Sequence, residues 1–172
     1  MDLDKIFYEI IGLCQSTTNS KDERLKKITD NAIAEMFERN PKLLVMKDSY
    51  GMNLGMYTAK YGLENATLIA LDNKEAILQQ DNCGNNIGMY SACSKLERAV
   101  LKALDNKKAS IKQGFNGLNI GMCAAINGLD KAVEKSLKNK VAKSQVDSQN
   151  KTIEMHYQEY LEHNENTNGL II

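Results

Sequence analysis

Apolar and polar residues repeat along most of the chain with a period of 33 residues. The pattern Asn-(Leu/Ile)-Gly-Met occurs at residues 53–56, 86–89 and 119–122, and a weaker copy, Thr-Ile-Glu-Met, follows at 152–155. Self-similarity at a fixed period is the sequence signature of a repeat architecture. Further columns keep the same register without gaps: Gly51, Gly84, Gly117 and Asn150; Ala59, Ala92 and Ala125; Leu63, Leu96 and Leu129; Leu71, Leu104 and Leu137.

Each unit predicts two short helices. In the first full unit, Asn53 can cap a helix over residues 54–61, because its side chain can accept a bond from an unpaired N–H group of the first turn. Gly62 then turns the chain, and a second helix is predicted over residues 64–72, with an acid at the positive end of its dipole. Asn73 suits the left-handed conformation that follows many helices, and a linking segment leads from there to the next unit.

Two helices of this length cannot bury their apolar face alone. Stacking equivalent pairs would bury a continuous core, so we expect an all-α solenoid of helix-turn-helix repeats with short turn tips. The column of Met56, Met89, Met122 and Met155 would pack inside it. We expect a single domain, divided into an N-terminal helix and divergent capping repeat (1–47), three repeats (48–80, 81–113 and 114–146), and a C-terminal cap and tail (147–172).

The two ends predict capping helices, because terminal repeats must expose a polar face to water. Apolar spacing favours a helix at the N-terminus, and Ser20 and Glu23 match a capping box that begins the next one. The N-terminal part is therefore expected to be a degenerate repeat plus one extra helix. The expected helices are residues 3–14, 20–28, 31–39 and 152–163, followed by a loose stretch at 164–169 and an apolar tail at 170–172.

The unit resembles the ankyrin repeat, since it has Asp-x-x-Gly at its start, Ala in the first helix, Gly at the turn and Leu late in the second helix. Residues 48–62 carry the resemblance best, and residues 81–113 and 114–146 match in register. Where that family usually has Thr-Pro-Leu-His, this chain has Asn53-Leu54-Gly55-Met56. A helical Gly costs about 1 kcal/mol against Ala, so we expect a packing reason for it, namely a close approach of neighbouring helices.

The resemblance implies non-catalytic recognition of another protein through the concave face, formed by the turn tips and the exposed positions of the first helices. These positions vary between units, and several are apolar or aromatic where solvent exposure is expected, which favours a partner-binding surface. The alternative is partial burial between neighbouring tips. The expected partner-binding residues are Tyr50, Met52, Lys60, Tyr61, Asn82, Cys83, Asn85, Cys93, Phe115, Asn116, Leu118 and Ile126.

Composition and charge exclude some classes of protein and leave one alternative function open. The chain has 172 residues, 22 basic and 22 acidic, so a basic field over the whole protein is excluded. A single proline argues against a turn-rich β-sandwich. Residues 95–143 contain 11 basic and 4 acidic residues. An alternative function is therefore binding of an acidic protein, an anionic lipid or nucleic acid through this lysine-rich block. The simpler interpretation is a solvated outer face.

The sequence contains no recognisable catalytic or phosphate-binding motif, so we expect that the protein is not an enzyme and uses no cofactor, metal or small-molecule substrate. We also expect it to be a monomer. Nucleic acid is disfavoured because Arg98 is the only arginine of the basic block. His156 and His163 are expected to be exposed. A third alternative is a thiol enzyme or redox sensor that uses Cys93 or Cys123.

Localisation is expected to be cytoplasmic. The four cysteines are dispersed and form no CxxC pair, which is typical of a reducing compartment. The N-terminal residues do not resemble a signal peptide, and no apolar run reaches the length of a membrane span. Delivery into a host cell stays open.

Overall fold

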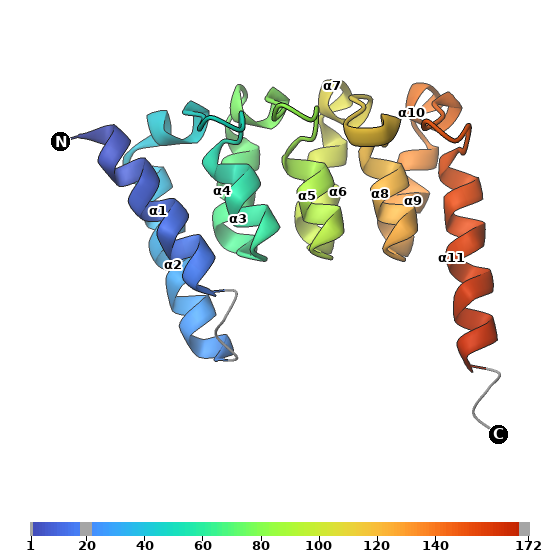
Figure 1. Cartoon of the computed structure of the whole chain (residues 1–172), viewed down its shortest axis with the longest axis horizontal. Coiled ribbons are helices and arrows are strands. Elements are labelled where there is room, and N and C mark those ends of the chain that lie inside the picture. Colours follow the sequence, from blue (N-terminus) through green and yellow to red (C-terminus); the bar gives the residue numbers. More distant parts are fainter. Residues whose placement is uncertain (1, 18–21, 169–172) are drawn as a thin grey trace.

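The protein is built from helices (Figure 1). The computed structural model describes residues 2–17 and 22–168, and these ranges contain no strand, which confirms the predicted all-α class. The α-helices are α1 (Leu3–Thr17), α2 (Glu23–Arg39), α3 (Leu54–Lys60), α4 (Glu64–Asp72), α5 (Ile87–Cys93), α6 (Glu97–Asp105), α7 (Lys107–Ser110), α8 (Ile120–Ile126), α9 (Asp130–Leu137), α10 (Lys140–Ser144) and α11 (Ile153–Asn168), and the short 3-10 helices are η1 (Pro41–Val45), η2 (Ala76–Leu78) and η3 (Phe115–Gly117).

Three helix pairs stand side by side between longer helices at the two ends (Figure 1). The first helices pack against one another in the order α3, α5, α8 and α11, and the second helices pack in the order α2, α4, α6 and α9. Helix α1 packs on α2 and α3, so it occupies the place of a first helix at the N-terminal end. The two helices predicted for the first full unit are confirmed to within one residue.

A buried asparagine begins each of the three first helices, as predicted. The side chains of Asn53, Asn86 and Asn119 accept a hydrogen bond from the backbone N–H three residues later, at 2.9, 3.1 and 2.9 Å. The amide group of Asn53 also donates to the carbonyl of Ala76 at 3.2 Å, and the other two make the equivalent bond. One side chain therefore both caps the first helix and holds the linking segment of its own unit.

The prediction of a left-handed Asn73 is wrong. Its backbone is extended (φ −76°, ψ 116°), and its side chain accepts hydrogen bonds from the N–H groups of Glu75 and Ala76. Asn106 and Asn139 cap α7 and α10 in the same way. Asparagine favours both conformations, and here its side chain begins a further short helical turn in the linking segment, which the sequence did not indicate.

The N-terminal part is a single helix pair, so the predicted extra helix is wrong. Residues 23–39 form one continuous helix, with Asp22 as its cap, whereas Ser20 lies outside the described residues. The predicted break falls at residues 29–30, where Asp30 is buried and accepts hydrogen bonds from the N–H groups of Asn65 and Ala66 at 2.9 and 2.8 Å. Asp30 therefore caps α4 from the neighbouring helix.

At the C-terminal end, α11 continues to Asn168, beyond the predicted end at residue 163, so residues 164–168 are helical rather than loose. Residue 169 and the tail at 170–172 lie outside the described residues. Met56, Met89 and Met122 are buried as predicted, but Met155 is 48% exposed, because no further helix packs beyond α11 in the described chain. Of the helices described, none combines the length and apolar character that a bilayer-crossing segment needs.

Candidate functional site

An aspartate organises the turn tip at the start of each of the first two full units. Asp48 accepts the backbone N–H groups of Tyr50 and Met52 with one carboxylate oxygen, and the other oxygen accepts the Tyr57 hydroxyl at 2.5 Å. Asp81 and Tyr90 repeat this pair at 2.6 Å. Burial, followed by the hydrogen bond to aspartate, raises the pKa of both tyrosine hydroxyls. Each tip is thereby fixed to the first helix of its own unit.

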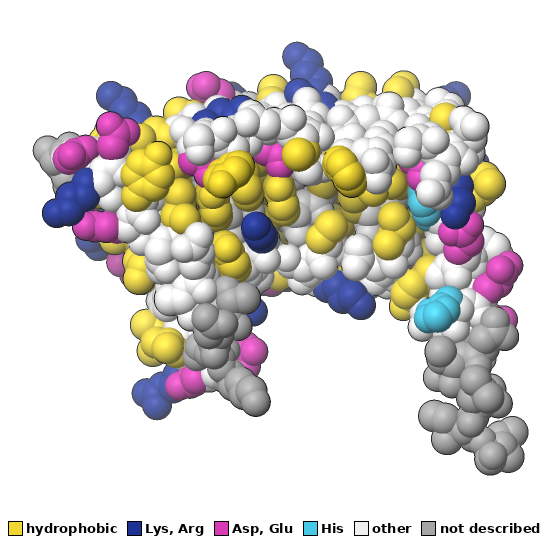
Figure 2. Space-filling model, viewed as in Figure 1, with side chains coloured by type: hydrophobic (Ala, Val, Ile, Leu, Met, Phe, Trp, Pro, Cys, Tyr) yellow, Lys and Arg dark blue, Asp and Glu magenta, His cyan; other side chains and the backbone are white. Residues whose placement is uncertain are grey.

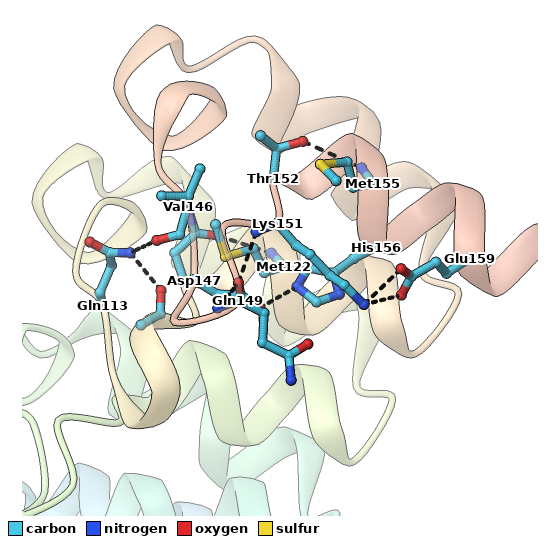
Figure 3. Close-up of polar contacts among 12 residues, drawn as sticks. Gln113, Met122, Val146, Asp147, Gln149, Lys151, Thr152, Met155, His156 and Glu159 are labelled. Carbon is cyan, nitrogen blue, oxygen red and sulfur yellow. Dashed lines mark hydrogen bonds and ion pairs between the residues drawn. The ribbon is translucent and has the colours of Figure 1, made fainter.

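The fourth copy uses a histidine in the place of the tyrosine (Figure 3). His156 is 8% exposed, so its predicted exposure is wrong, and its Nε2 lies 2.9 Å from Asp147 Oδ2. Asp147 also accepts the N–H groups of Gln149 and Lys151, and the Lys151 bond is the largest cause of its lowered pKa. His163 is exposed, as expected.

The third unit lacks both members of this pair, because Gly114 and Cys123 replace the aspartate and the aromatic ring. A pocket of about 420 Å³ lies here, between neighbouring tips and over α5 and α8; we call it the thiol pocket. The small Cys123 side chain in place of the aromatic ring leaves space at this junction. The position of the missing carboxylate is already filled, because a Cβ atom built on Gly114 would lie 2.5 Å from Asn85 Oδ1. The thiol pocket is lined by Cys83, Asn85, Met89, Tyr90, Cys93, Phe115, Leu118 and Cys123.

A second pocket, of about 350 Å³, adjoins the first and shares Cys83 and Tyr90 with it; we call it the tyrosine pocket. Hydrophobic side chains form a band over α3, α5 and α8 on the face that carries both pockets (Figure 2). Ten of the twelve residues predicted from the sequence line one pocket or the other, and Asn116 and Ile126 line neither. Cys123, which the sequence named as a candidate thiol, also lines a pocket. Sequence reasoning missed the remaining lining residues, which are Gln15, Tyr57, Asp81, Met89 and Tyr90.

The predicted residues differ in exposure. Tyr50 and Phe115 are 70% and 59% exposed and stand at the rims of the two pockets. Met52 is buried, which corrects its expected exposure, and its sulfur lies 3.9 Å from the Tyr90 hydroxyl of the next unit. Tyr61, Asn85 and Leu118 are half-buried, whereas Lys60, Asn82, Cys83, Cys93, Asn116 and Ile126 are exposed.

Two of the polar tip residues join neighbouring units. The backbone N–H of Asn82 donates to the carbonyl of Tyr50 at 2.9 Å, and its side chain donates to the carbonyl of Ser49. The side-chain oxygen of Asn85 accepts the N–H of Phe115 at 3.1 Å. These two asparagines therefore contact the adjacent tip, which is the alternative that the sequence left open, and they also form part of the pocket walls.

Two cysteines interact in the thiol pocket. Exposed Cys93 and buried Cys123 both line it, and the side-chain interaction with Cys123 lowers the pKa of Cys93 to about 7. The same interaction, together with burial, raises the pKa of Cys123. Burial raises the pKa of Cys14 to about 12. The sequence singled out Cys93 and Cys123 separately, but their proximity depends on the relative placement of α5 and α8.

Three of the ten lysines in the lysine-rich block pair with acids of the preceding unit. Lys135 lies 2.6 Å from Asp105, and the pairs Lys102–Asp72 and Lys131–Glu97 bridge units in the same manner. A depression of about 590 Å³ at this side is lined by four lysines together with Asp105, but two of the four already contact carboxylates. Three basic residues of the block pair with acids outside residues 95–143, namely Arg98 with Glu64, Lys102 with Asp72 and Lys143 with Glu154, so local pairing offsets three of the seven excess charges.

Among the described residues, no group of three or more histidine, cysteine, aspartate or glutamate side chains is placed to hold a metal ion. No protein-family model matches this chain, and a search of curated proteins finds no match.

Proposed function

We propose that this chain is an ankyrin-like solenoid that binds another protein through its first-helix face, meaning the surface of α3, α5, α8 and their turn tips. The 33-residue register supports the family assignment, because equivalent residues adopt equivalent backbone conformations. Gly51, Gly84 and Gly117 have φ values of 76°, 84° and 76°, and Asn150, which replaces the glycine in the fourth copy, has φ 60°. A left-handed residue at each tip is what glycine and asparagine tolerate best.

The observation that carries the binding proposal is the pair of adjoining pockets on this face. Both are lined mainly by apolar or aromatic side chains, and each has an exposed aromatic residue at its rim. Apolar anchors that fill such pockets dominate the energy of many protein interfaces. We therefore expect the partner to present two neighbouring apolar side chains, one for the thiol pocket and one for the tyrosine pocket.

The scaffold suits this role because the pocket walls come from packed helices and hydrogen-bonded tips. Tyr57 and Tyr90 are held by the tip aspartates, and the tips are held to each other by Asn82. A surface whose side chains are already fixed loses little conformational entropy when it binds. The proposed function requires no catalytic group and no cofactor.

The proposal is tested by partner capture with the variant Tyr61→Ala/Phe115→Ala, which removes one aromatic wall from each pocket. We expect at least about a 10-fold loss of affinity, since removing an interface anchor costs about 2 kcal/mol or more. The matched control is Tyr8→Ala/Val141→Ala, whose side chains are 61% and 52% exposed and line neither pocket.

Circular dichroism of both variants establishes that each keeps its helices. Equal capture by the wild type and the pocket variant, with a control that behaves normally, would exclude the first-helix face as the binding surface. Hydrogen exchange with and without the captured partner provides an independent measurement, in which slowed exchange is expected for the tip around Phe115 and for the N-terminal turns of α5 and α8.

A further inference from the structure

The two thiols of the thiol pocket belong to neighbouring repeats. Cys93 is the last residue of α5, and Cys123 lies in the middle of α8, which packs beside it. The exposed thiol of Cys93 is open to small molecules from solvent, whereas Cys123 is only 6% exposed. The arrangement thus places one accessible sulfur and one buried sulfur in the wall of the same pocket.

Packing of the repeats does not require sulfur at these positions. One unit earlier, the equivalent positions hold Lys60 and Tyr90, and one unit later they hold Ile126 and His156. The same junction is therefore built elsewhere in the chain with side chains that have no redox chemistry. Cysteine occurs at both positions only between the second and third repeats.

We propose that Cys93 and Cys123 form a redox-sensitive dithiol, in which Cys93 reacts with a hydroperoxide and Cys123 resolves the product to a disulfide between α5 and α8. The roles follow from position, because the reacting thiol must be accessible and the resolving thiol must be adjacent to it. The interaction with Cys123 favours the thiolate of Cys93, and the thiolate is the form that attacks peroxides.

The reaction is balanced in two steps. The Cys93 thiolate attacks one oxygen of the hydroperoxide and the O–O bond breaks; the sulfur loses two electrons and becomes a sulfenic acid, and the leaving oxygen takes a proton to form water or an alcohol. The Cys123 sulfur then attacks the Cys93 sulfur, the S–O bond breaks, and the departing hydroxide leaves as water with the proton from Cys123. Two thiols and one peroxide thus give one disulfide.

The disulfide would change both the junction between the two repeats and the wall of the thiol pocket. It would close a covalent link across the junction of two repeats and fix α5 against α8, on which it packs in the reduced protein. It would also convert two thiols of the pocket wall into a single bridge. This inference does not rest on partner binding, since its readout is chemical.

The other cysteines provide internal comparisons. Cys14 is fully buried in α1 and its raised pKa of about 12 keeps it protonated, so it should not react while the protein is folded. Cys83 is exposed and lines the same pocket from its tip, so it is the one competing thiol that could reach the site.

The test treats the full, reduced chain with one equivalent of hydrogen peroxide, alkylates the remaining thiols and maps disulfides in a tryptic digest without reduction. Cys83 and Cys93 fall in the peptide 75–95, whereas Cys123 falls in the peptide 113–131. The proposal predicts a cross-link between these two peptides, with a mass loss of about 2 Da for the two hydrogens. The same cross-link must form in Cys83→Ser, which shows that Cys93 is its source.

Two variants separate the roles. Cys93→Ser should abolish the cross-link, because it removes both the reactive thiolate and one of the two sulfurs of the bridge. Cys123→Ser should leave Cys93 as a sulfenic acid that a carbon nucleophile such as dimedone traps. Three outcomes would overturn the proposal: a bridge within the peptide 75–95, loss of the cross-link in Cys83→Ser, or cross-linked dimers in place of the intramolecular bridge. These outcomes are measured on the wild type and on Cys83→Ser, so they do not depend on how well the other two variants fold.

Discussion

Ile87 of the second repeat fills the space directly beside Gly55 of the first. A Cβ atom built on Gly55 would lie 2.6 Å from Ile87 Cδ1 and 2.7 Å from the Cβ atom of Ala70 in the second helix of the same unit. Gly88 meets Ile120 and Gly121 meets Ile153 in the same manner. Two departures from the ankyrin pattern, a glycine inside the first helix and an aliphatic residue in place of proline, are therefore a single packing feature.

The first prediction concerns this contact. Gly55→Ala should lower the free energy of unfolding by about 1 kcal/mol or more, because overpacking a close contact typically costs about 1–3 kcal/mol and the gain in helix propensity offsets only part of it. Ile87→Val removes the Cδ1 methyl group nearest to the new Cβ. The double variant should therefore lose less free energy of unfolding than the two single variants lose when their losses are added. Urea denaturation followed by circular dichroism measures each value.

Gly12→Ala is the matched control, since a Cβ atom built on Gly12 would have nothing within 4 Å. In this helix interior the change should stabilise the protein by about 0.5–1 kcal/mol. If Gly55→Ala were stabilising to the same extent, the close approach of the repeats would not explain why glycine recurs at this column.

A second prediction concerns the cap that one unit supplies to the next. The residue before α4 is Leu63, whose side chain makes no capping bond, and buried Asp30 of α2 accepts the two N–H groups instead. Asp30→Ala should therefore destabilise the protein by about 1–2 kcal/mol, the cost of losing a helix cap. Thermal unfolding measures the effect. Asn31→Ala removes one exposed side-chain contact to the neighbouring Asn65 and should cost much less; equal effects would contradict the capping role of Asp30.

The three central repeats could be predicted from the sequence because each unit carries its own signals. Asn53 caps α3 and Gly62 ends it within the same unit, so both roles are legible in a local pattern. Asp30 shows the limit of such reasoning. It lies in the predicted break between two helices, but its partners are backbone groups of another helix more than thirty residues away, and no local pattern contains that information.

The sequence predicted which residues form the candidate site but not the pockets that they line. Repeat columns place most of the predicted residues on one face, and ten of them line the two pockets. The pockets themselves, and the proximity of Cys93 to Cys123, depend on how far apart neighbouring repeats sit. One signal was present in the sequence: Cys123 replaces the aromatic ring of the tip pair with a much smaller side chain, which indicates free space at this position.

A third prediction concerns acid stability. The pKa of Asp147 is lowered in the folded protein, chiefly by the N–H of Lys151, so the unfolded chain binds a proton at this group more readily. The sign of the linkage follows: the stabilisation is fully present above the unfolded pKa of about 4 and is lost as the pH falls through the lower folded value. Asp147→Asn should therefore be less stable than wild type near neutral pH, and the difference should shrink as the pH falls below about 4.

Urea titrations at a series of pH values measure that difference, and Asp4→Asn, at the exposed start of α1, corrects for the change in net charge. A gap between wild type and Asp147→Asn that stays constant from pH 6 to pH 2 would show that Asp147 does not titrate with folding.

The last prediction separates the two binding proposals that the sequence left open. Lys131 and Lys135 bridge to Glu97 and Asp105 of the preceding repeat, and Lys138 contacts Glu134. Exposed pairs of this kind contribute about 0–1 kcal/mol each, so reversing all three lysines to glutamate should lower stability modestly and leave partner capture through the first-helix face unchanged. Capture that survives Tyr61→Ala/Phe115→Ala but is lost with the triple reversal, and that weakens steeply with added salt, would instead identify the lysine-rich block as the binding surface.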